Sequence, residues 1–178
     1  MITSLLGKGE ILTEERTSEY VFGLVRDDEI NECTEIITKH VGEMRLNKET
    51  VKQRIRDPNF MTLVGKSGGK MKGVINSLIP PNQIQPAKII YVIVTDQDSA
   101  LKGLPGMLID EFINELKRRF PKIPGVEVEF PSRETNAVAM YSIKGFSVEG
   151  FTRDGMTGID VVMLRKRFNQ STANTPIA

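Results

Sequence analysis

Residues 91–112 read YVIVTDQDSALKGLPGMLIDEF, in which an apolar strand leads through a polar turn with two glycines into an amphipathic helix. The segment 88–95 is an almost continuous run of apolar, mostly β-branched residues, and this predicts a central strand buried on both faces. After the turn, apolar residues recur every four positions from Leu104 to Phe120, which predicts a helix over residues 104–119. The alternating segment 125–130 predicts a second strand, so the three segments form one crossover.

The segments on either side of this crossover predict antiparallel pairs of strands and further helices. Strands are expected at residues 20–26, 60–66, 70–79, 146–151 and 158–168, and helices at residues 27–41, 46–57 and 134–144. Asp27 or Asp28 and Asn47 are the expected N-terminal caps, and Gly68 and Gly69 supply a tight hairpin turn. The order predicts an α/β (α+β) fold with a mixed, mostly antiparallel central sheet and helices on both faces.

Length and composition predict one domain. A chain of 178 residues with 39% hydrophobic content can build one compact core but is short for two. We expect this single domain at residues 19–168, a partly flexible extension at 1–18 and a disordered tail at 169–178.

Charge and residue counts argue against several classes of function. Lys and Arg number 24 against 23 Asp and Glu, so the chain lacks the basic field that drives nucleic-acid binding. The longest apolar run, residues 89–94, is far shorter than the ~20 residues of a membrane helix, and we expect neither a membrane segment nor a secretory leader. With one cysteine, Cys33, and one histidine, His40, the chain is expected to hold no disulfide and no metal and to be cytoplasmic.

The turn at residues 98–106, DSALKGLPG, lies where a ligand of an α/β sheet is expected, at the carboxyl end of a central strand. Unpaired N–H groups at the start of the following helix can bind an anion, and Gly103 and Gly106 would allow it to approach closely. The turn has neither the GK[ST] of a Walker A motif nor the G-x-G-x-x-G of a dinucleotide site. From this segment alone, an ordinary strand-to-helix turn with Pro105 in the first helical turn is the simpler interpretation.

Two motifs on this frame resemble the GNAT superfamily of acyl-CoA-dependent N-acetyltransferases. The turn KGLPGML at 102–108 is similar to the family's R/Q-x-x-G-x-G/A turn, and AVAMYSIKGF at 137–146 is similar to its A-x-x-x-Y-x-x-x-G-F helix. Ala137, Tyr141, Gly145 and Phe146 match the second motif. The resemblance covers residues 19–168 and implies the GNAT-like acyl-CoA N-acyltransferase fold.

The resemblance implies acetyl-CoA as co-substrate and a primary amine, on a small molecule or a protein, as acceptor. The strand around residues 92–94 would separate from its neighbour and pair its backbone with the pantetheine arm, while residues 100–107 would meet the pyrophosphate. Lys102 would add a cationic donor. The implied coenzyme-binding residues are Val92, Ile93, Val94, Ala100, Leu101, Lys102, Gly103, Leu104, Pro105, Gly106, Met107 and Asn136.

The chain departs from the family pattern in two places: the turn expected to bind the pyrophosphate, residues 100–107, which we call the phosphate turn, and the position of the expected general base. Ala100 stands where Arg or Gln is expected, and Pro105 has no N–H to donate. Asp96 and Asp98 place negative charge near the proposed anion site, and Ile90 replaces a carboxylate that often serves as general base.

For catalysis, the resemblance implies direct acetyl transfer with Tyr141 as general acid, whereas helix packing alone would also explain this tyrosine. His40 or a water molecule is the candidate base, and His40 can instead simply complement a helix C-terminus. Glu127 and Glu129 share one face of a strand and could attract a cationic acceptor, although solvated surface is the default interpretation.

Three interpretations of function follow from the sequence. The first is an N-acetyltransferase, the second a catalytically weak or inactive GNAT-like acyl-CoA-binding or regulatory module, and the third an unrelated α/β ligand-binding domain. The acceptor amine and the oligomeric state stay open, with a homodimer as one option.

Overall fold

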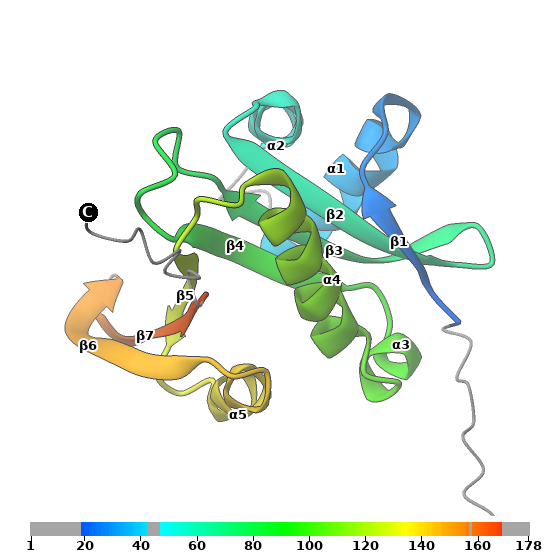
Figure 1. Cartoon of the computed structure of the whole chain (residues 1–178). Helices are drawn as coiled ribbons and strands as arrows, with labels where there is room; N and C mark the ends of the chain where they lie inside the picture. The colour runs from blue at the N-terminus through cyan, green and yellow to red at the C-terminus, as the bar shows by residue number, and fades with distance from the viewer. Residues whose placement is uncertain (1–18, 43–46, 157, 169–178) are drawn as a thin grey trace, which may run out of the picture.

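A single sheet of seven strands organises residues 19–42, 47–156 and 158–168, which a computed structural model describes (Figure 1). The strand order is β1-β2-β3-β4-β5-β7-β6, and among these pairs only β4 and β5 run parallel. The strands are β1 (Val21–Leu24), β2 (Phe60–Ser67), β3 (Lys70–Leu78), β4 (Ala87–Val94), β5 (Gly125–Pro131), β6 (Ser147–Met156) and β7 (Ile159–Arg167). The extension and tail expected at 1–18 and 169–178 lie outside the described residues.

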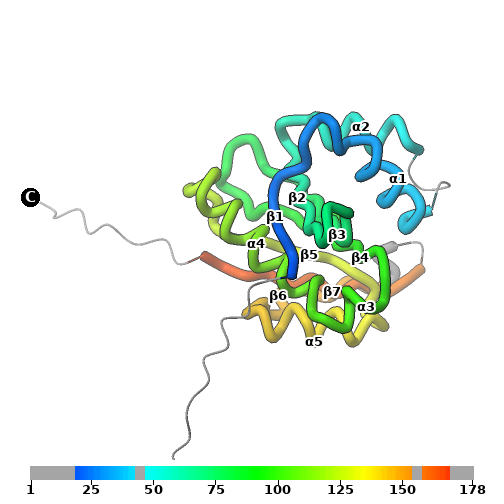
Figure 2. Tube along the Cα trace, turned by 90° about the vertical axis from the view of Figure 1, so that its right-hand side faces the viewer, coloured from blue at the N-terminus to red at the C-terminus, as the bar shows by residue number. Residues whose placement is uncertain are grey.

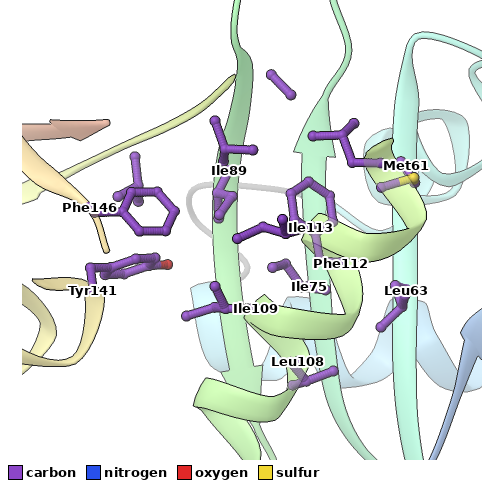
Figure 3. Packing of buried hydrophobic residues seen from close by; sticks show 14 of the residues in the cluster. Met61, Leu63, Ile75, Ile89, Leu108, Ile109, Phe112, Ile113, Tyr141 and Phe146 are labelled. Atoms are coloured by element: carbon purple, nitrogen blue, oxygen red, sulfur yellow. The ribbon is translucent and has the colours of Figure 1, made fainter. Parts of the chain in front are cut away.

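Helices cover both faces of the sheet (Figures 1 and 2). On one face, α1 (Ile30–Val41) and α2 (Lys48–Arg56) enclose a cluster that contains Cys33, Val51 and Val74, the α1–α2 cluster. On the other face, α4 (Leu104–Arg119) and α5 (Thr135–Ile143) enclose a larger cluster, the α4 cluster (Figure 3). Two short elements, η1 (Asp27–Glu29) and α3 (Gln97–Leu101), precede α1 and α4. The predicted fold class is therefore confirmed.

Local sequence signals place several element ends as expected. The side chain of Asn47 caps α2 by accepting a hydrogen bond from the Thr50 N–H at 2.8 Å. The same helix ends at Arg56 because Asp57, the residue before Pro58, is extended. Gly68 and Gly69 form the β2–β3 turn with φ of +56° and +76°, the region that glycine adopts without strain.

The expected cap at Asp27 or Asp28 is wrong. Both residues lie inside the 3-10 turn η1, and α1 begins only at Ile30. Glu29 provides the capping interaction, since its Oε2 accepts from the Arg26 N–H at 3.1 Å. Its carboxylate is also paired with Lys66 of β2, and this contact with a distant strand fixes where the chain turns into the helix.

The predicted burial of residues 88–95 on both faces is correct only in part. Ile89 and Ile93 are buried, but Ile90 is 37% exposed and Lys88, Tyr91, Val92 and Val94 are half-buried. The segment after β4, expected to be a polar turn only, contains the short helix α3. The side chain of Asp96 caps this helix by accepting a hydrogen bond from the Ser99 N–H at 2.8 Å. Strand β4 is central, as predicted, with three strands on each side.

None of the described helices is long and apolar enough to cross a membrane.

Phe112 should dominate the stability of the larger core. It is the largest of the fully buried side chains and lies between α4 and the sheet (Figure 3). Replacing Phe112 by Ala should lower the free energy of unfolding by about 3–5 kcal/mol, because apolar contacts are lost and a cavity remains. Denaturant unfolding checks this. Val21→Ala, at a side chain 72% exposed, is the control and should change stability by about 0.5 kcal/mol or less. Equal losses in the two variants would contradict the packing described here.

Candidate functional site

An extra residue in β4, Ile90, forms a β-bulge at the candidate site. Tyr91 pairs with Asn76 of β3, but the next pair joins Ile89 to Ser77, so Ile90 has no counterpart on β3. Such a β-bulge changes the side of the sheet to which the following side chains point. Accordingly, Ile89 packs in the α4 cluster, whereas Ile93, four residues later, packs in the α1–α2 cluster.

The same position marks where β4 and β5 separate. Their parallel pairing covers only Ala87, Lys88 and Ile89, opposite residues 126–128, although both strands continue beyond it. From Ile90 onward, the backbone groups that β4 directs toward β5 have no strand partner among the described residues. The two strands run apart toward their C-terminal ends (Figure 1). An extended ligand can therefore add itself to this inner edge of β4, as a peptide adds to an exposed sheet edge.

The turn after β4 ends in a left-handed glycine and a helix start. Gly103, with φ +83°, is the N-terminal cap of α4, and Pro105 lies in the first turn. The first backbone bond of the helix runs from the Met107 N–H to the Gly103 carbonyl at 3.2 Å. Since Pro105 has no N–H, Leu104 and Gly106 carry the N–H groups of this turn that have no backbone partner in the described part of the chain.

Lys102 is engaged by two carboxylates rather than directed at this turn. Its Nζ lies 3.0 Å from an oxygen of Asp98 and 3.2 Å from one of Glu19. The hydrogen bond to Asp98, followed by that to Glu19, raises the pKa of Lys102 above its usual range. Ala100 and Leu101, also predicted coenzyme contacts, are exposed on α3.

A different lysine lies beside the turn. Lys144, at the end of α5, extends to α4 and pairs with Asp110. Its Cε is 2.9 Å from the position that a Cβ would occupy on Gly106, and its Nζ is 3.4 Å from that position. Lys144 was not among the predicted coenzyme contacts, although it lies inside the motif YSIKGF, directly before Gly145.

Tyr141 lies in an aromatic group on the α4 side of the sheet. Its ring is stacked on Phe130 at 5.7 Å and meets the edge of Phe146 at 5.0 Å, and the residue is only 4% exposed. Figure 3 shows the hydroxyl directed away from α5, toward the side on which Ile89 and Ile109 lie. Burial raises the pKa of the Tyr141 phenol above its usual range. Asn136, the remaining predicted contact, is exposed near the start of α5.

The structure does not bring His40 to the place where β4 and β5 separate. His40 is exposed at the end of α1, where its Nδ1 lies 2.8 Å from the Ile36 carbonyl oxygen. It borders a pocket of about 490 Å³ over the start of β3 and the end of β4, and no residue of β5 contributes to that pocket. The candidate base and the candidate acid are therefore placed at different parts of the sheet.

Charged residues line the face of β5 opposite α4. Val126 and Val128 pack in the α4 cluster, so Glu127 and Glu129 point to the other side. Both carboxylates are already paired, Glu127 with Arg165 at 2.9 Å and Glu129 with Lys88 at 2.7 Å. These two residues therefore do not present a free acidic surface to a cationic acceptor.

Tyr91 is a half-buried tyrosine whose hydroxyl group is buried, and no sequence motif singled it out. It follows the bulge residue Ile90 and packs against the α1–α2 cluster. Its hydroxyl is buried without a hydrogen-bond partner in the described structure, and burial raises its pKa above the usual range. In the described ranges, no three His, Cys, Asp or Glu side chains gather into a candidate metal site.

The sequence matches no protein-family model and no curated protein, whereas the structure resembles known ones. The ribosomal-protein-S18-alanine N-acetyltransferase from Escherichia coli superposes with a TM-score of 0.70 at 17% identity, over 87% of this chain and 97% of that protein. A spermidine N-acetyltransferase chimera from Vibrio cholerae and hSSAT gives 0.69 at 13% identity, over 84% and 96%. NAA60 from Arabidopsis thaliana, solved with acetyl-CoA, gives 0.69 at 11% identity, over 85% and 99%.

Likeness at such low identity establishes the fold and leaves the reaction to be argued from the site. The agreement covers nearly the whole length of each of the three proteins, so no large part of their common fold is missing here. The chain has the fold of the GNAT superfamily of N-acetyltransferases, as its two motifs predicted.

Proposed function

We propose that the protein is an N-acetyltransferase that moves an acetyl group from acetyl-CoA to a primary amine. The observation that carries this proposal is the separation of β4 from β5 after Ile89, which leaves an inner strand edge open in the middle of a sheet. An unpaired edge inside a sheet costs hydrogen bonds, and a ligand with amide groups, such as the pantetheine arm, would replace them. The fold, shared with acetyltransferases, agrees with this assignment.

In this proposal the residues after the bulge bind the coenzyme. The backbone of residues 92–94 pairs with pantetheine, and the turn at residues 100–107 binds the pyrophosphate through the N–H groups of Leu104 and Gly106. Asn136 is near the start of α5, on the helix that also carries Tyr141. These assignments use the geometry of the turn and the sequence motifs together.

Tyr141 is the proposed general acid. The amine nitrogen bonds to the acetyl carbon and gives up one proton to a base, the carbon–sulfur bond breaks, and the sulfur leaves as a thiolate that needs a proton. Tyr141 supplies it from the phenol. Burial makes the phenol a weaker acid, but the same burial raises the pKa of a thiolate held beside it, so position decides the transfer. With His40 bordering a pocket that contains no residue of β5, water is the better candidate for the base.

A catalytically weak or inactive coenzyme-binding module is the second candidate. It is favoured by one specific set of observations at the phosphate turn: no cation at Ala100, no N–H at Pro105, and Lys102 held by two carboxylates. Both candidates bind the coenzyme, and turnover separates them.

The acceptor, the compartment and the assembly stay predictions. One similar structure is named for an alanine of a ribosomal protein and another for spermidine, so these neighbours do not select between a protein and a small amine. A cytoplasmic location and a homodimer are likewise predictions.

Coenzyme binding is the first test. Calorimetric titration of the full chain with CoA should give a saturable heat, and backbone amide shifts on adding CoA should concentrate in residues 90–107. The matched region for comparison is β1 with the β2–β3 turn, which should move little. Shifts confined to the pocket beside His40 would place the ligand elsewhere and contradict the proposed site.

Tyr141→Phe should lower turnover by about 10²-fold or more while leaving CoA affinity nearly unchanged, because only the proton donor is removed. The measurement is thiol release from acetyl-CoA with a panel of primary amines, under conditions where chemistry limits the rate. Tyr20→Phe, a buried tyrosine next to β1, is the control and should retain the rate. Equal turnover of wild type and Tyr141→Phe would leave Tyr141 with a packing role only.

The Tyr141 phenol should keep its proton to a higher pH than a free phenol, whose pKa is ~10. Burial raises the pKa of Tyr141, so the neutral form persists as the pH rises through that value. The difference in tyrosinate absorbance between wild type and Tyr141→Phe should stay at zero up to pH ~10 while circular dichroism reports a folded chain. A Tyr141-dependent rise in absorbance well below that pH would mean that the hydroxyl is solvated.

A further inference from the structure

The ion pair between Lys144 and Asp110 spans the two helices that border the proposed coenzyme site. Lys144 ends α5, the helix of Tyr141, and Asp110 lies one turn beyond Gly106 on α4. The lysine chain passes over Gly106, with Cε 2.9 Å and Nζ 3.4 Å from the position of a Cβ there. Glycine at this position leaves the room that the lysine occupies.

Packing and stability do not account for this arrangement. The side chain of Asp110 is about half exposed and that of Lys144 a quarter exposed, and ion pairs between such side chains contribute little to stability because water screens them. The α5 terminus already has another partner, since Lys166 Nζ donates to the Lys144 carbonyl at 2.5 Å. The ammonium of Lys144 is thus held beside the first turn of α4, although neither the stability of α4 nor the capping of α5 requires it.

The charges around the turn identify Lys144 as its available cation. Among the described residues, Lys102 is shared by Asp98 and Glu19, whereas Lys144 pairs with the carboxylate of Asp110 alone. A phosphate on the N–H groups of Leu104 and Gly106 would lie next to the Lys144 ammonium. Phosphate offers several charged oxygens, so it competes well with one carboxylate for an ammonium.

We propose that Lys144 binds a phosphate group of the coenzyme and that Asp110 is its resting partner, exchanged for the phosphate on binding. This inference rests on the proposed function, because it assigns a residue to the same coenzyme site. Lys144 replaces the cation that Ala100 lacks and the N–H that Pro105 lacks. Asp110 keeps the ammonium close to the turn but also opposes the incoming anion.

The two partners of the pair should therefore respond in opposite directions. Lys144→Met removes the cation and should weaken CoA binding by about tenfold, the scale of one charge-assisted hydrogen bond. Asp110→Asn keeps the shape, frees the ammonium and removes a negative charge, so it should tighten CoA binding several-fold. A pair with only a structural role would make both substitutions neutral or weakening.

Calorimetry at fixed ionic strength with CoA, dephospho-CoA and pantetheine tests the proposal on the full chain. The effect of Lys144→Met should be present with CoA and absent with pantetheine, which carries no phosphate. Its persistence with dephospho-CoA would assign the contact to the pyrophosphate, and its loss would assign it to the 3′-phosphate. Lys117→Met is the matched control, since Lys117 lies near the other end of α4 over the Phe168 ring and should leave CoA affinity unchanged.

Thermal unfolding of each variant without ligand checks that it is folded before affinity is compared. Unchanged CoA affinity in folded Lys144→Met, or an equal loss with pantetheine, would overturn the role of Lys144 while leaving the proposed function intact. A loss of affinity in Lys102→Met alone would return the role to Lys102. If the wild type bound no CoA at all, the proposed function itself would fail.

Discussion

The β-bulge at Ile90 is the constraint on which the rest of the structure depends. A regular β4 would keep Ile89 and Ile93 on one face, yet they pack in clusters on opposite faces, so one strand anchors α4 and α1 at once. The pairing of β4 with β5 also ends at Ile89. The bulge thus coincides with the opening of the sheet, and the site lies where the two cores share a strand.

Much of the fold could be predicted from the sequence because its signals are local. The spacing of apolar residues gave α4, the side chain of Asn47 gave the start of α2, and two glycines gave a hairpin turn. The bulge could not be predicted in this way. Residues 88–95 are apolar whether or not the strand stays paired, and the position of an extra residue is set by the register against β3, a contact between distant segments. The cap of α1 failed for a similar reason, since Lys66 of β2 holds Glu29.

In the candidate site, too, the residues of contiguous motifs could be predicted from the sequence, whereas contacts between distant segments could not. Tyr141 and the glycine turn were predicted because each belongs to a contiguous motif. The partners of the lysines were harder to foresee. The Lys102–Asp98 pair has i, i+4 spacing on adjoining turns and could have been read from the sequence, but Glu19 and Lys102, or Lys144 and Asp110, are brought together only by the fold. Charge near a phosphate turn therefore cannot be counted from the turn alone.

The packing of α5 then couples the two proposed roles. Tyr141 and Lys144 are three residues apart, which places them on adjacent turns of one helical side. Phe130 and Phe146 hold the Tyr141 ring on two sides, and this same contact fixes the rotation of the helix that delivers Lys144 to Gly106. A shift of α5 would move the phenol and the ammonium together, one relative to the proposed thioester position and the other relative to the phosphate turn. Under both proposals, the helix that carries the acid is also the one whose lysine would offset the altered phosphate turn, so the proposed coenzyme binding and proton transfer would depend on a single packing arrangement.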